Sequence, residues 1–344
     1  MGLFRSAPAS PLPAPLPAAT TATTGPNTAA DSHGARRVHV GIYLNQIHEV
    51  NIKGNKFTAD FYVWFRWLGN GDFKPHETFE VMNGRVESKE VNLDTTLTNV
   101  PLDESQPAVK LPEVRYAQLR VVATITHFYD ISRFPLDDHD LAIMIEDEEN
   151  EKDKVLYLAD RQKGQLSPEV AVPGWRVGEY RAAVVTHGYR SNFGDTSLES
   201  NAKSVYSRFV FTIPLLRSGW GYFFKLFAGL FTATLISMLV FFIKPTEVDP
   251  RFGLGVGAIF GAVASEYVVT SSLPDTSVMT MADTLHIVAF VFIFISIGES
   301  VYSLKLYGSE QEKLMARSRK LDRWCALLMA TGYVVASALV VALS

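Results

Sequence analysis

The sequence predicts an all-β domain followed by a bundle of four membrane-spanning helices. Two observations predict it. Before Arg217 the apolar residues come in short runs broken by Asp, Glu, Asn and Gly, as in strands and turns. After Arg217 they come in long runs almost free of charge, as in helices that cross a bilayer. We expect a tail at residues 1–37, an extracellular β-sandwich at 38–216 and a transmembrane domain at 217–344.

The composition of the 344-residue chain limits its class further. The net charge is −4 and no basic patch alternates with aromatic residues, so we expect no nucleic-acid partner. The one cysteine, Cys325, leaves no intrachain disulfide and no cysteine-type zinc site. The Pro-, Ala- and Thr-rich tail lacks the apolar stretch of a secretory signal, and we expect it to be disordered.

Strand-like segments fill residues 38–216. Apolar and polar residues alternate, with many β-branched and aromatic side chains, in VHVGIYLNQI, KFTADFYVWFRW and LRVVATITHFYDI. Turn-forming clusters such as Lys53-Gly54-Asn55 separate such segments. About ten short strands with no helical pattern between them favour an antiparallel, immunoglobulin-like sandwich.

Four apolar runs follow, and we expect helices at about residues 219–243, 251–273, 281–304 and 322–344, with a short loop at 305–321. The first run makes a helix of about 35 Å, enough to cross the hydrocarbon core. Lys and Arg occur in the link between the first and second runs and crowd the link between the third and fourth, while the remaining link has neither. By the positive-inside rule the two basic links are cytoplasmic, which places the β-domain and the C-terminus outside.

The second apolar run is unlike a lipid-facing helix, because it contains Glu266 and four glycines. At alternating steps of four and three residues, one face has a carboxylate, then small residues, a bulky aromatic, and hydroxyls at the outer end: Asp249, Gly253, Gly257, Phe260, Ala264, Tyr267 and Thr270 or Ser271. Several copies around an axis would form a pore with a charged mouth and a hydrophobic constriction. Equally, the glycines could be close-packing positions in a bundle, and Asp249 could be the N-cap of the helix.

Four motifs in order carry a family resemblance that extends from about residue 38 to 344. They are FYDISRFPLDDHDL (128–141), YFFKLFAGLFTATLISMLVFFI (222–243), PRFGLGVGAIF (250–260) and SSLPDTSVMTMADTLHIVAFVFIFISIGES (271–300). In these motifs the chain resembles the pentameric ligand-gated ion channels, the Cys-loop receptor superfamily. His127 and Leu141 stand where animal receptors have their two cysteines, which is the pattern of bacterial members without that disulfide.

The resemblance implies a homopentamer around a central pore, opened by a small molecule, a proton or a divalent cation. It implies a ligand site between neighbouring β-domains, with the candidate residues Trp64, Arg66, Phe79, Tyr189, Phe193 and Tyr206. It also implies an interface that couples the β-domain to the helices, formed by Glu49, Phe134, Pro135, Asp137, Asp138, Arg217 and Pro274. Arg217 facing Asp137 or Asp138 would be a partly buried charge pair.

The same resemblance bears on the pore. Phe260 takes the position of the family's central hydrophobic gate, and Gly253 and Gly257 stand where hydroxyl residues are usual. Asp249 resembles the acidic ring that accompanies cation selectivity, and five carboxylates around one mouth would concentrate cations. We therefore expect cations to be favoured over anions.

Residues 146–154, EDEENEKDK, hold six carboxylates in nine positions. Such a run is usually a solvated loop, but clustered carboxylate oxygens also suit calcium. Glu146, Asp147 and Glu148 are therefore candidate ligands for calcium modulation, although no cofactor is expected to be required. The eight histidines leave proton gating open.

Two other functions remain open. A non-conducting pentameric membrane receptor or scaffold on the same fold is favoured by the glycine-rich pore helix. A membrane enzyme is disfavoured, because the apolar runs contain no metal-ligand cluster, nucleophile elbow or phosphate loop. We expect permeant ions and membrane lipid as partners and no catalytic residue.

Overall fold

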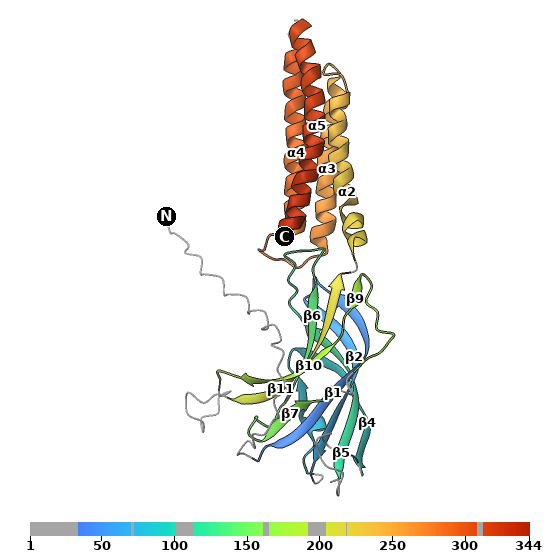
Figure 1. Cartoon of the computed structure of the whole chain (residues 1–344), viewed down its shortest axis with the longest axis vertical. Coiled ribbons are helices and arrows are strands. Elements are labelled where there is room, and N and C mark those ends of the chain that lie inside the picture. The colour runs from blue at the N-terminus through green and yellow to red at the C-terminus, as the bar shows by residue number, and fades with distance from the viewer. Residues whose placement is uncertain are drawn as a thin grey trace. The chain divides into compact units, whose positions relative to one another are not determined.

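The computed structural model describes residues 34–69, 72–98, 100, 113–160, 165–191, 204–217, 219–307 and 312–344. Residues 35–344 form one compact unit, in which strands gather in one domain and helices in another (Figure 1). This arrangement confirms the predicted order of a β-sandwich and four apolar helices. The tail at residues 1–33 lies outside the described residues.

The β-domain is a sandwich of two sheets. The described strands are β1 (Arg36–Asn51), β2 (Lys56–Leu68), β3 (Phe79–Val81), β4 (Gly84–Leu97), β5 (Val114–Thr126), β6 (His139–Asp147), β7 (Val155–Ala159), β8 (Gln165–Leu166), β9 (Trp175–Val177), β10 (Arg181–Gly188) and β11 (Val205–Arg217). One sheet has the order β4-β5-β2-β1-β7, with β8 beside β1, and the other has the order β10-β11-β6-β3, with β9 beside β11. A short helix, α1 (Pro75–Thr78), precedes β3.

The predicted turn at Lys53-Gly54-Asn55 joins β1 to β2, which pair antiparallel. Asn55 has a φ of 50°, in the left-handed region that asparagine enters more readily than most residues. Gly54 donates its backbone N–H to Asn51 Oδ1 at 2.7 Å, a side-chain contact that replaces a ladder hydrogen bond. The turn therefore forms because its residue types tolerate this backbone.

The core of the sandwich consists of side chains that alternate along the strands. Phe57, Phe61 and Phe65 of β2 and Phe209 and Phe211 of β11 are fully buried. Each such ring contributes about 1.5–3 kcal/mol on burial. A core of this kind removes the need for a disulfide, and the one cysteine is free in the last helix.

The transmembrane helices are α2 (Trp220–Met238), α3 (Val248–Ser271), α4 (Met281–Tyr307) and α5 (Glu312–Leu343), and a 3-10 turn, η1 (Leu239–Phe242), extends α2. Each of the four is long and apolar enough to cross a membrane. The chain is therefore an integral membrane protein with four spans. Asp249 lies in the first turn of α3 and not at its N-cap, which is Glu247.

The last helix differs from the prediction at its start. The loop expected at residues 305–321 is much shorter, because α4 continues to Tyr307 and α5 already begins at Glu312. The charged sequence around Arg317 suggested a loop, but its polar residues divide between two faces of a helix. Ser318 and Asp322 point inward, where they are buried and hydrogen-bonded.

A buried polar cluster joins three helices at their cytoplasmic ends. Arg251 of α3 donates from Nη2 to Asp322 Oδ2 of α5 at 2.8 Å, and from Nε to the carbonyl of Ile243 at 3.1 Å. Ser303 of α4 donates to Asp322 Oδ1 at 2.8 Å, and its hydroxyl lies 2.8 Å from that of Ser318. The guanidinium and the carboxylate thus form a buried ion pair inside the bundle, while Arg251 Nη1 is buried without a hydrogen-bond partner among the described residues.

The four glycines of α3 fall into two pairs. A Cβ on Gly255 would lie 2.7 Å from Cγ1 of Ile297 on α4, and one on Gly261 would lie 3.2 Å from Cβ of Ala233 on α2. A Cβ on Gly253 or Gly257 would have nothing within 4 Å. Close packing therefore explains one pair of glycines and leaves the other pair on an open face of the helix.

This division predicts opposite effects for one substitution at two positions. Gly255→Ala should destabilise the protein by about 1–3 kcal/mol, because the methyl group is forced against Ile297. Gly257→Ala should leave stability unchanged or raise it by up to about 1 kcal/mol, since alanine is the better helix former. Thermal unfolding of the two detergent-purified variants is the measurement, and equal shifts would contradict the assignment.

Candidate functional site

Arg217, the last residue of β11, lies where the β-domain meets the helices. Its Nη2 donates to Asp137 Oδ1 at 2.9 Å, and its backbone N–H donates to Asp138 Oδ1 at 2.8 Å. The side chains of Arg217 and Asp137 are only 8% and 2% exposed. The charge pair expected from the sequence is therefore formed, and Arg217 engages both aspartates.

Asp137 has a second partner that the sequence analysis did not anticipate. Its Oδ2 lies 2.6 Å from Nε2 of His139, two residues along the chain. Burial alone would raise the pKa of Asp137, but the hydrogen bond to His139 and the charge of Arg217 outweigh it and lower the pKa. The carboxylate therefore stays ionised inside the protein.

Aromatic rings from three segments surround the Arg217 guanidinium. Its Cζ lies 3.7 Å from the ring centre of Trp175 on β9, 5.1 Å from that of Tyr222 on α2 and 5.7 Å from that of Phe134. Phe134 belongs to the loop at residues 128–138, before β6, which we call the signature loop. The rings of Phe134 and Tyr222 meet edge to face at 6.4 Å. A desolvated cation over aromatic faces gains about 2 kcal/mol, so one side chain holds both domains together.

Two further contacts between the domains were missed. Lys53 Nζ, in the β1–β2 turn, donates to the carbonyl of Ser271 at 3.0 Å, at the C-terminal end of α3. Carbonyls at a helix C-terminus lack intrahelical partners and favour a cation. The backbone N–H of Met281, which begins α4, donates to the carbonyl of Ser132 in the signature loop at 2.8 Å. The sequence gave one sign of the first contact, namely a basic residue in the β1–β2 turn. It gave no sign of the second, because a backbone hydrogen bond does not depend on the residue type.

The other predicted coupling residues are placed differently. Pro135 is buried next to Phe134, with a cis peptide bond between them. Glu49 is exposed and accepts from Asn51 Nδ2 at 2.9 Å. Pro274 is half-buried in the link between α3 and α4. In the described part of the chain, neither Glu49 nor Pro274 hydrogen-bonds to Arg217 or to the two aspartates.

Trp64 and Arg66, both on β2, share one buried acceptor. Asp160 Oδ2 receives Trp64 Nε1 at 3.0 Å and Arg66 Nη2 at 2.8 Å. The Trp64 ring lies flat across Gly41 of β1, where a Cβ would overlap it. Asp160 was not foreseen, and its position directly after a strand was the only clue. Both predicted ligand residues are thus held in place by the protein itself.

These two residues also form part of the wall of a hollow of about 600 Å³ on the β4-β5-β2-β1 sheet. Tyrosines supply most of the remaining aromatic surface, and the hollow is lined by Tyr43, Tyr62, Tyr116, Gln118 and Asn92 among others. Volume and lining suit a small molecule with an apolar body.

Tyr206 lies on β11 of the other sheet, and Tyr189 directly follows β10 of that sheet. Their rings are 5.6 Å apart. Tyr189 donates its hydroxyl to Glu146 Oε2 at 2.9 Å, and Arg208 Nε donates to Glu146 Oε1 at 2.6 Å. Burial, followed by the hydrogen bond to Glu146, raises the pKa of Tyr189. The structure therefore brings these two candidates together but keeps them on a different sheet from Trp64; Phe193 lies outside the described residues.

The three carboxylates proposed for calcium are not gathered into one site. Glu146 pairs with Arg208, whereas Asp147 accepts from the Thr78 hydroxyl at 2.7 Å and from the backbone N–H of Asn150 at 2.8 Å. No group of three or more His, Cys, Asp or Glu side chains suited to a metal occurs in the part of the chain that is described. Calcium modulation through Glu148 and its neighbours stays a prediction.

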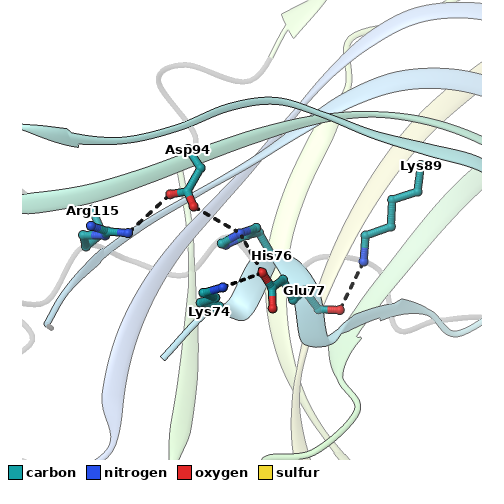
Figure 2. A network of polar contacts seen from close by, with 6 residues as sticks. All are labelled: Lys74, His76, Glu77, Lys89, Asp94 and Arg115. Atoms are coloured by element: carbon teal, nitrogen blue, oxygen red, sulfur yellow. Dashed lines mark hydrogen bonds and ion pairs between the residues drawn. The ribbon is translucent and has the colours of Figure 1, made fainter. Parts of the chain in front are cut away.

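Phe79 belongs to the core and not to an open site. It is 5% exposed and its ring centre lies 5.1 Å from that of Phe65, beneath the ammonium of Lys89. The helix before it holds a polar network around the buried His76 (Figure 2). His76 Nε2 lies 3.8 Å from Asp94 and 3.9 Å from Glu77, too far for hydrogen bonds, and burial lowers its pKa.

The six residues expected to line a pore share one exposed face of α3. Asp249, Gly253, Gly257, Phe260, Ala264 and Tyr267 are all exposed in the single chain. The opposite face is buried against the other helices and consists of Arg251, Gly255, Ala258, Ala262, Ser265 and Val269. Phe260 and Tyr267 are 71% and 75% exposed, large apolar surfaces that a lone subunit leaves uncovered.

The chain thus combines a β-sandwich with four apolar helices long enough to cross a membrane, and one of these helices has a polar and aromatic face that is uncovered in the single chain. The human gamma-aminobutyric acid receptor subunit rho-3 is 23% identical over 303 residues, which cover 83% of this chain and 62% of that protein. The rat subunit rho-1 is 27% identical over 249 residues, 71% of this chain and 48% of the relative. A proton-gated ion channel of Gloeobacter violaceus is 18% identical over 286 residues, 76% of this chain and 71% of the relative.

The fold and these relatives agree with the motifs: the chain resembles the pentameric ligand-gated ion channels over most of its length, with a β-domain ahead of four apolar helices. No protein-family model matches it. The chain spans about half to three-fifths of the length of the two receptor subunits. These relatives are receptors and a channel, not enzymes.

Removal of Asp137 should be costly, because Arg217 would remain buried without its counter-charge. We expect Asp137→Ala to destabilise the protein by about 3–5 kcal/mol. The matched control is Asp140→Ala, since Asp140 pairs with Arg181 in a bridge whose side chains are 57% and 54% exposed. That bridge should contribute less than about 1 kcal/mol. Thermal unfolding of both variants tests the difference.

Acid should weaken the β-domain through His127. Burial, followed by the positive charge of His139, lowers the pKa of His127 to about 4, so the unfolded chain binds this proton first. The neutral, buried His127 contributes fully to the free energy of unfolding above about pH 6.5. This contribution is lost as the pH falls toward 4, by about 1.4 kcal/mol per pH unit. His127→Gln should flatten the pH dependence of the unfolding temperature in that range, whereas the same exchange at the exposed His48 should not. A slope unchanged by His127→Gln would refute this.

Proposed function

We propose that this chain is one of five identical subunits of a ligand-gated channel whose pore is lined by α3 and which favours cations. The observation that carries the proposal is the exposed face of α3. It holds all six residues expected to line the pore, while the glycines that pack against neighbours lie elsewhere on the helix. Other copies of the chain would cover this face and enclose an aqueous path.

The ligand would bind where neighbouring β-domains meet. The tyrosine-lined hollow on the β4-β5-β2-β1 sheet and the Tyr189–Tyr206 pair on the β10-β11-β6-β3 sheet belong to opposite faces of the sandwich. In a ring of subunits, one face of each copy can meet the other face of the next. The two relatives from animals are named for gamma-aminobutyric acid and the bacterial one for protons, so a small molecule and a proton are the first ligands to test.

The route from ligand to pore would run through Arg217. Arg217 contacts Asp137 and Asp138, which lie in the signature loop just before β6. It also contacts α2 through the ring of Tyr222. Lys53 adds a second contact, directly onto the end of α3. Movement of the sheets would therefore reach both the first helix and the pore helix.

Cation preference rests on Asp249. Its carboxylate is exposed in the first turn of α3, at the cytoplasmic mouth assigned by the basic links. A ring of five such groups attracts cations and repels anions. Phe260, about three turns further along, would form the apolar constriction that closes the path by excluding water.

Recording from purified protein in a planar bilayer tests this function. During application of acid, calcium and amines, including gamma-aminobutyric acid, we expect currents whose reversal potential in a salt gradient follows the cation. Asp249→Asn should shift that potential toward the anion side. A chloride-like potential in the unmodified protein would overturn the selectivity, and silence under every ligand would favour the non-conducting receptor.

Phe260→Ala should open the closed pore, because a methyl group cannot exclude water across the same radius. We expect current without ligand, or activation at lower ligand concentration. Phe294→Ala is the matched control, since Phe294 is 74% exposed on α4 and Phe260 71% on α3. The same effect from both variants would remove Phe260 from the gate.

A further inference from the structure

The outer halves of α2 and α3 each carry a charged side chain. Lys225 lies five residues after the start of α2, and Glu266 lies five residues before the end of α3. Both of these helix ends are on the side of the β-domain, because β11 leads into α2 and Lys53 bonds to the carbonyl of Ser271. An ionisable side chain inside a membrane is costly unless it meets an opposite charge or water, so each of the two requires a partner.

The single chain does not supply these partners. Among the residues that the structure describes, neither Lys225 nor Glu266 forms an ion pair or a hydrogen bond. The side chain of Lys225 is exposed and that of Glu266 is half-buried, so both reach the surface of the helix bundle. The two charges have opposite signs, and each could therefore satisfy the other if two copies of the chain brought them together.

The two charges lie at nearly the same depth. The helices α2 and α3 run in opposite directions, and a Cβ on Gly229 of α2 would lie 3.7 Å from Cβ of Ser265 on α3. Lys225 is four residues closer to the β-domain than this contact, and Glu266 is one residue closer. Their backbone positions therefore differ by about 4.5 Å along the helices, a difference that the flexible four-carbon stem of lysine covers.

Glu266 lies on the flank of α3 that is turned away from α2 of its own chain. Gly255 packs against Ile297 and so marks the flank of α3 that faces α4. Gly261 packs against Ala233 and marks the flank that faces α2. Glu266 follows Gly255 by eleven residues, which is about three helical turns, and it therefore lies on the α4 flank.

Lys225 lies at the opposite edge of the subunit. It is one turn from Gly229, where α2 meets α3, and about 120° around the helix from Phe231. The ring of Phe231 lies 6.4 Å from that of Tyr333, so α5 covers a different face of α2. In a closed ring of identical subunits, one edge of each subunit meets the opposite edge of the next, and all copies of a residue lie at one depth. Lys225 and Glu266 would then face each other at every boundary.

We propose that Lys225 of one subunit forms an ion pair with Glu266 of the next subunit. The ammonium group donates to the carboxylate in the outer half of the membrane, where low polarity strengthens the attraction. The pair holds α2 of one copy to α3 of its neighbour, directly beside Tyr267 of the pore face. This inference rests on the proposed ring of identical subunits and names the side chains that join them within the membrane.

Cysteine cross-linking between copies tests whether the two positions meet. In full-length protein with Cys325→Ser, Lys225→Cys and Glu266→Cys are placed on two differently tagged copies, which are coexpressed and treated with a short bifunctional thiol reagent. We expect a cross-linked product that carries both tags, and monomers when either exchange is present alone. The control replaces Glu266→Cys by Val256→Cys, because Val256 is 50% exposed on the same helix but lies about 15 Å deeper and should not react.

Exchange of the two charges tests whether their attraction holds the ring together. Lys225→Glu and Glu266→Lys each place two like charges at every boundary, and we expect each to lower the fraction of protein in the ring by about tenfold or more. The two exchanges combined restore opposite charges and should restore the ring. Lys225→Arg keeps the charge and should leave the ring intact, which separates charge from misfolding. Native mass spectrometry of the detergent-purified protein measures the assembly.

The outcomes separate this inference from the proposed channel. If rings form but the tagged copies are not cross-linked, or the combined exchange assembles no better than the single ones, the ion pair is overturned and the channel function is not. Lys225 would then extend to the lipid headgroups. If the unmodified protein forms no ring, the proposed function is overturned together with the ion pair.

Discussion

The ion pair between Arg217 and Asp137 is the constraint on which the rest of the structure depends. Two charges are removed from water at a junction between domains, a position that is stable only when both are present and hydrogen-bonded. Asp138, His139 and three aromatic rings complete the shell around them. Because Arg217 ends the last strand and the first helix begins almost at once, its fixed side chain sets where the helices start.

A second buried pair plays the same part at the other end of the bundle. Arg251 at the start of α3 and Asp322 in α5 hold the ends of two helices that are far apart in sequence. Arg251 thus holds one end of α3 to α5, and at the other end Lys53 joins the helix to the β-domain through the carbonyl of Ser271. Between them α3 meets its neighbours through small residues such as Gly255 and Gly261, which permit close approach.

Architecture could be read from the sequence because it depends on patterns that are local. Alternation in KFTADFYVWFRW and the apolar run at 222–243 specify strand and helix whatever surrounds them. The partners of single side chains could not be read in this way. Nothing near Trp64 in sequence indicates Asp160, and the acidic run at 146–154 gives no sign that Glu146 belongs to Arg208. The predicted start of α5 was too late for a related reason. Asp322 turns inward because it pairs with Arg251 of α3, which lies 71 residues earlier in the chain.

The open pair of glycines has a consequence for any ion that would pass. In the proposed pore, Gly253 and Gly257 of five subunits would present only backbone whose carbonyls are already bonded within the helix. An ion there would meet no group able to replace its bound water, so it would travel as a hydrated particle. Such a pore would not select ions by dehydration in its inner half. Selection would depend on attraction by the charge of Asp249 and on exclusion by size at Phe260, which together would sort ions by sign and hydrated radius.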